Sequence, residues 1–101
     1  MRMLMTATIP HEPFNSLVRA GTAGSKIRAI LEELAPEAAY FCEEDGKRCA
    51  VLVVDVSDQS RIPFYAEPFF LSFNADCRFR IAMSAEDLGN AGLEKLGQRW
   101  K

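Results

Sequence analysis

The chain has 101 residues, of which 49% are hydrophobic and 26% are charged, and its formal charge is −2. This length and composition predict one soluble globular domain over residues 1–101, and without an excess of positive charge we expect no binding to nucleic acid. No apolar run is long enough to span a membrane, and the first residues do not resemble a signal peptide. An odd count of three cysteines without metal-ligand spacing indicates a cytoplasmic location.

The first third of the chain predicts a strand followed by a long helix. Apolar residues alternate along residues 3–9, which indicates a strand. Residues 11–34 place apolar side chains three and four positions apart, which predicts one amphipathic helix. Gly21 and Gly24 lie within that apolar stripe, so we expect either a close approach of the helix to the sheet or a local break. Residues 38–42 form the next predicted strand.

A hairpin and a buried strand follow. Asp45-Gly46 is the usual signal for a two-residue hairpin turn. This turn sets three facing pairs: Glu44 with Lys47, Glu43 with Arg48, and Cys42 with Cys49. The facing cysteines would lie about 4.5–5.5 Å apart, within reach of a disulfide, although reduced thiols are expected in the cytoplasm. Residues 50–56 are almost entirely apolar, which predicts a central strand buried on both faces.

The rest of the chain predicts a second helix, a fourth strand and a terminal helix. Ser57 and Asp58 offer a cap for a short or kinked helix that ends near Phe73. Residues 76–83 alternate as a last strand, and Ser84 begins a terminal helix. The order β-α-β-β-α-β is that of a ferredoxin-like α+β fold. We expect the sheet order 4-1-3-2, with strands one and three parallel to each other and strand four antiparallel to strand one.

Alternation divides this sheet into two faces. The face expected to carry the helices is uncharged and comprises Met3, Met5, Ala7, Ile9, Ala39, Phe41, Ala50, Leu52, Val54, Val56, Cys77, Phe79, Ile81 and Met83. The other face comprises Leu4, Thr6, Thr8, Tyr40, Cys42, Cys49, Val51, Val53, Asp55, Arg78, Arg80 and Ala82. An apolar patch on this second face needs a cover. We expect a homodimer packed sheet to sheet; the alternative is that the C-terminal helix folds over the patch within one chain.

Two arginines on the second face are the main candidates for a binding site. Arg78 and Arg80 are spaced by two, so both point the same way and could bind an anionic or carbonyl oxygen of a small organic molecule. Thr6, Thr8 and Tyr40 are the other candidates for ligand contact on this face.

Two residues are candidates for moving a proton. If strands one and three are parallel, Asp55 lies toward the same edge of the sheet as Arg78, where His11 also begins. His11 is the one side chain that titrates near neutral pH without perturbation, so His11 or Asp55 could act as an acid or base. The alternative is that Asp55 and Arg78 form a structural ion pair in a dimer interface. One histidine and scattered cysteines form no metal-binding cluster, and we expect no cofactor.

The whole chain resembles a group of short, uncharacterised bacterial proteins of the dimeric α+β barrel type. The matching stretches are His11-Glu12-Pro13-Phe14-Asn15, Gly21-Thr22-Ala23-Gly24, Glu67-Pro68-Phe69-Phe70 and Ala85-Glu86-Asp87-Leu88. Some members carry the name pantothenate synthetase, but that ligase is much longer and uses paired histidines near its nucleotide, whereas this chain has one histidine. The wider superfamily includes cofactor-free monooxygenases, lyases and ligand sensors.

Three functions are therefore open, because no motif specifies a reaction. The first is a dimeric barrel that binds a small, possibly anionic, organic molecule between its sheets. The second is a non-enzymatic dimerisation or interaction protein. The third is a cofactor-free monooxygenase, which rests on likeness of fold alone.

Overall fold

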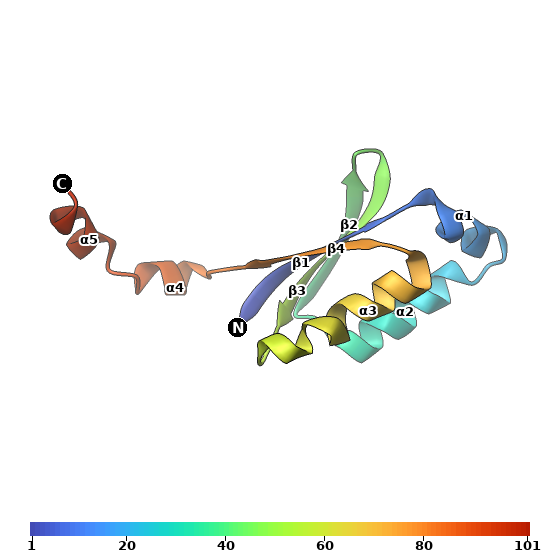
Figure 1. Cartoon of the computed structure of the whole chain (residues 1–101), viewed down its shortest axis with the longest axis horizontal. Helices are drawn as coiled ribbons and strands as arrows, with labels where there is room; N and C mark the ends of the chain where they lie inside the picture. Colours follow the sequence, from blue (N-terminus) through green and yellow to red (C-terminus); the bar gives the residue numbers. More distant parts are fainter.

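Four strands form one open antiparallel sheet in the computed structural model, which describes residues 1–101 (Figure 1). The elements, in chain order, are β1 (Arg2–Ile9), α1 (His11–Arg19), α2 (Ala23–Leu34), β2 (Ala38–Glu44), β3 (Lys47–Asp55), the 3-10 turn η1 (Gln59–Arg61), α3 (Ile62–Phe73), β4 (Asp76–Ile81), α4 (Ala85–Gly89) and α5 (Leu93–Arg99). The strand order is β2-β3-β1-β4, which is 4-1-3-2 when read from β4. This α+β architecture is consistent with a ferredoxin-like fold.

The predicted long helix is two helices. α1 ends at Arg19 and α2 begins at Ala23, and between them Gly21 has a φ of +77°. Glycine adopts this left-handed conformation without the steric cost that other residues bear. A Cβ at Gly21 or Gly24 would meet nothing within 4 Å. Gly21 therefore marks a local break, and neither glycine makes a close approach to the sheet.

The predicted parallel pairing of strands one and three is wrong. β1 pairs with β3 in the antiparallel direction, with Arg2 opposite Asp55 and Thr8 opposite Cys49. The topology requires this, because α1 and α2 return the chain so that β2 runs parallel to β1, and the hairpin then reverses β3. β4 pairs with β1 antiparallel, as predicted.

The predicted hairpin register is confirmed. Glu44 lies opposite Lys47, Glu43 opposite Arg48 and Cys42 opposite Cys49. Asp45 and Gly46 both have positive φ, +53° and +77°, as a tight turn between two right-twisted strands requires. The strands extend further toward this turn than predicted, since β2 reaches Glu44 and β3 begins at Lys47.

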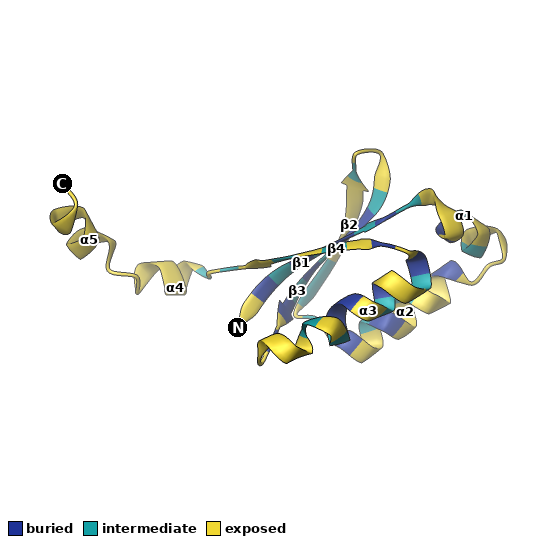
Figure 2. Cartoon of the chain, viewed as in Figure 1, coloured by how far each residue is buried: buried dark blue, intermediate teal, exposed yellow.

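The core lies between the sheet and α1, α2 and α3, and these helices leave the other face of the sheet uncovered (Figures 1 and 2). The largest fully buried side chains are those of Met5, Ile9, Leu52, Val54, Val56, Phe69 and Phe73. Three residues predicted for this face are exposed instead: Phe41, Ile81 and Met83. Phe41 sits on the edge strand β2, and Ile81 and Met83 lie at or beyond the end of β4, so the helices do not fully cover them.

The C-terminal arm, residues 84–101, extends away from the sheet (Figure 1). β4 ends at Ile81, two residues earlier than predicted, and the terminal helix is divided into α4 and α5. Ser84 caps α4 as predicted, accepting a hydrogen bond from the backbone N–H of Asp87 at 3.1 Å. Every residue from 85 to 101 is exposed, so the arm does not fold over the sheet within one chain. No helix here has the length and apolarity that a bilayer span requires.

The centre of β3 offers a test of the core. Leu52 is fully buried, and replacing it with alanine leaves a cavity that the sheet cannot close. We expect Leu52→Ala to lower the free energy of unfolding by about 2–5 kcal/mol, measured by urea denaturation. Leu71→Ala, at a position that is 83% exposed, is the control and should change stability by less than about 0.5 kcal/mol. An equal loss of unfolding free energy in the two variants would contradict the placement of Leu52 in the core.

Candidate functional site

Three rows of side chains cross the uncovered face of the sheet, here called the open face. From β2 to β4 they are Ala38, Val53, Leu4 and Arg80; Tyr40, Val51, Thr6 and Arg78; and Cys42, Cys49, Thr8 and Asp76. Leu4, Val51 and Val53 are half-buried, and Tyr40 is 67% exposed. The predicted apolar patch is therefore present and uncovered, with the two arginines along one edge of it.

A hollow of about 400 Å³ opens on this face near the hairpin. Its lining residues are Thr6, Cys42, Glu43, Glu44, Cys49, Val51, Arg78 and Arg80. Three of the predicted ligand-binding residues, Thr6, Arg78 and Arg80, are thus brought together. Thr8 and Tyr40 lie on the open face but do not line the hollow. Its volume falls within the range usual for small-molecule sites.

Glu44 connects three strands around this hollow. Its carboxylate lies 3.6 Å from Nη1 of Arg78 on β4, and it accepts hydrogen bonds from Oγ1 of Thr8 at 3.3 Å and from Sγ of Cys49 at 3.5 Å. β2 and β4 are opposite edges of the sheet, so in a flat sheet they would be about 14 Å apart. The ion pair between Glu44 and Arg78 therefore requires the hairpin to curl over the open face, which makes that face concave.

Glu44 was not among the predicted site residues. Alternation along β2 does contain the signal, because Glu44 follows Tyr40 and Cys42 on the same face of the strand. Its facing partner in the register, Lys47, takes no part in an ion pair. The ion pair with Arg78, which spans the sheet from β2 to β4, depends on the curl of the sheet.

The two guanidinium groups differ in what they contact. Arg78 is held by Glu44, although its side chain is still 74% exposed. Arg80 forms no ion pair anywhere in the chain. An exposed arginine without a carboxylate partner remains free to bind an anion through paired N–H groups. The hollow therefore contains one positioned and one unpaired positive charge.

The cysteines beside the hollow are free thiols of different character. Cys42 is exposed and Cys49 is buried. Burial, together with the hydrogen bond to Glu44, raises the pKa of Cys49 to about 12. Burial also raises the pKa of Cys77, on the helix side of β4, to about 11. Cys49 is thus a neutral thiol that donates to the Glu44 carboxylate at physiological pH.

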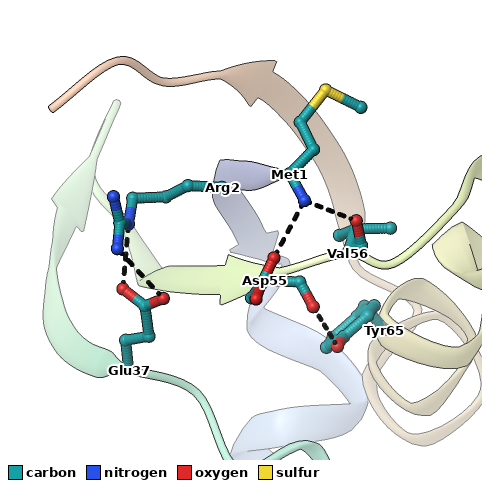
Figure 3. A network of polar contacts seen from close by, with 6 residues as sticks. All are labelled: Met1, Arg2, Glu37, Asp55, Val56 and Tyr65. Atoms are coloured by element: carbon teal, nitrogen blue, oxygen red, sulfur yellow. Dashed lines mark hydrogen bonds and ion pairs between the residues drawn. The ribbon is translucent and has the colours of Figure 1, made fainter. Parts of the chain in front are cut away.

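The predicted meeting of Asp55 with Arg78 is wrong, because β3 runs antiparallel to β1. Asp55 lies opposite Arg2 and Arg78 opposite Thr6, a separation of about 13 Å along the strand. Asp55 instead accepts a hydrogen bond from the amino group of Met1 at 2.9 Å (Figure 3). This contact holds the pKa of Asp55 below its usual range, so Asp55 belongs to a polar cluster at the far end of the sheet.

His11 does not reach the hollow either. It is exposed at the start of α1, and it forms no side-chain hydrogen bond or ion pair in the structure. Neither residue predicted to move a proton is therefore part of the hollow. Nowhere in the chain do three or more His, Cys, Asp or Glu side chains gather closely enough to hold a metal ion.

Comparison with known proteins identifies no family for this chain. The chain matches no protein-family model, and no curated protein was found to match its sequence.

The thiols give a test of the geometry around Glu44. Alkylation requires the thiolate, and the raised pKa of Cys49 leaves very little of this thiol ionised near pH 8. In native protein treated with iodoacetamide, we expect Cys42 to react first and Cys49 to react at least about a hundredfold more slowly, with a rate that rises about tenfold per pH unit. Mass spectrometry of the peptides measures both rates. Rapid labelling of Cys49 in folded protein would contradict its burial and its bond to Glu44.

Proposed function

We propose that the protein is a homodimer of the dimeric α+β barrel type, in which two open faces pack together and enclose a small organic anion. The apolar patch of Leu4, Tyr40, Val51 and Val53 supports the dimer, since monomeric proteins rarely leave such a patch on a sheet uncovered. A two-fold axis through the patch would bring each patch against its copy.

The observation that carries the binding proposal is the hollow with its two guanidinium groups. Arg80 has no partner in the chain, while Arg78 is positioned by Glu44 at 3.6 Å. A carboxylate or phosphate would supply the missing partner for Arg80. Apposition of a second open face would remove the hollow from bulk water, and ion pairs strengthen when water is excluded.

The lining favours a molecule with an apolar body and one acidic group. Val51 and the two facing cysteines supply the less polar wall, and Thr6 supplies a hydroxyl between that wall and the arginines. Glu43 and Glu44 disfavour a ligand with several negative charges. The proposed ligand class is therefore a small organic monoacid, and the proposal assigns binding without a reaction. Three free thiols suit a protein of the reducing cytoplasm.

The dimer is tested at Val53, which lies on the open face outside the hollow. Val53→Asp would bury an unpaired carboxylate in the interface, at a cost of several kcal/mol. We expect sedimentation equilibrium to show association weakened by about a hundredfold or more relative to the unchanged chain. Val18→Asp, at a 50% exposed position on α1, is the matched control and should leave association unchanged. A chain that is monomeric at all concentrations would refute the dimer.

The binding site is tested with benzoate and salicylate as probes. We expect isothermal titration calorimetry to detect binding of at least one, and Arg78→Ala with Arg80→Ala to weaken it about tenfold or more, since each lost charged hydrogen bond costs about 1.5–3 kcal/mol. Lys26→Ala with Arg28→Ala, which removes two positive charges from the exposed side of α2, is the control. A double arginine variant that dissociates the dimer and has the same probe affinity as the unchanged chain would favour the non-enzymatic interaction protein instead.

A further inference from the structure

The C-terminal arm is exposed along its whole length (Figure 2), and it carries large apolar side chains. Leu88 is 46% exposed, Leu93 58%, Leu96 48% and Trp100 78%. Leu93 and Leu96 lie on one side of α5, and Trp100 follows at the residue that ends the helix, so the three continue one apolar stripe by their spacing of three and four. Such a stripe on a helix usually packs against another surface.

The arm also lacks the length to be stable by itself. α4 has five residues and α5 has seven, whereas isolated helices shorter than about 12–15 residues are marginal in water. The molecule measures 60 × 28 × 19 Å, and the arm accounts for its elongation (Figure 1). A surface that orders these two short helices must therefore come from outside this chain.

The charges of the arm indicate what that surface is. Residues 84–92 carry two acidic side chains and no basic one, while residues 93–101 carry three basic side chains and one acidic. None of these charged side chains forms an ion pair within the chain. The first half of the arm is thus complementary in charge to the second half, and Gly92, with a φ of +76°, separates the two helices.

We propose that the C-terminal arms of two copies of this chain pair antiparallel, with α4 of each copy against α5 of the other. In this arrangement Glu86 of one copy faces Lys95 and Arg99 of its partner, and the two-fold axis repeats the contact. The leucines and Trp100 fill the seam between the arms. This inference goes beyond the proposed function and does not depend on it, because the arm is separate from the open face and from the hollow.

Trp100 is the only tryptophan in the chain, so it reports on the arm directly. As the concentration of the full chain is raised, we expect its fluorescence emission to shift to shorter wavelength and its quenching by acrylamide to fall several-fold, in step with association measured by sedimentation. An emission maximum typical of exposed tryptophan in the associated protein would overturn the inference. The open-face dimer would still stand if Val53→Asp weakened association as expected above.

Charge reversal then tests the antiparallel pairing. One full-length variant, Lys95→Glu with Arg99→Glu, makes the arm acidic, and another, Glu86→Lys with Glu94→Lys, makes it basic. We expect the Trp100 shift to be lost in each variant alone and restored when the two are mixed in equal amounts. Restoration in the mixture cannot arise from a change within one arm. Lys26→Glu with Arg28→Glu, a double reversal on α2, is the control and should keep the shift.

Two results would contradict the pairing of arms. If both variants keep the shift alone, charge does not direct the contact. If both lose it and the mixture does not restore it, the arm binds some other surface, such as the open face of the second copy. In either case the probe affinities of the Arg78 and Arg80 variants would still decide the proposed ligand site independently.

Discussion

The structure depends on the fact that all of the helices that pack on the sheet lie on one side of it. Successive side chains of a strand point to opposite faces, so covering one face fully buries Met5, Leu52 and Val54 and leaves their sequence neighbours uncovered. Those neighbours include Leu4, Val51 and Val53, which form an apolar patch on the uncovered face. The dimer is proposed because one face of the sheet is covered by helices and the other leaves its apolar patch uncovered.

The curl of the β2–β3 hairpin makes this uncovered face concave and forms the hollow on it. The Glu44 carboxylate reaches Arg78 across the sheet and accepts hydrogen bonds from Thr8 and Cys49 on the strands between. The exposed ion pair contributes little stability by itself. It places one guanidinium group near the Glu44 carboxylate, beside the unpaired Arg80.

The local features of the fold could be predicted from the sequence, and the relations between distant strands only in part. Asp45-Gly46 determines the hairpin register, since the turn requires two residues of positive φ. The arginines were correctly placed on the open face by alternation. The position of Asp55 was predicted wrongly, because β3 runs antiparallel to β1 and not parallel to it, which puts Asp55 at the opposite end of the sheet. The contact of Glu44 with Arg78 depends on sheet curl, which no local pattern encodes.

The central claim is that a second copy covers the open face, and hydroxyl-radical footprinting of Tyr40 tests it most directly. Tyr40 is 67% exposed in the single chain, and Phe70, on α3, is 41% exposed and lies away from this face. Oxidation of Tyr40, measured by mass spectrometry, should fall several-fold as protein concentration rises, while oxidation of Phe70 stays constant. Constant oxidation of Tyr40 up to concentrations at which the protein has associated would contradict the account.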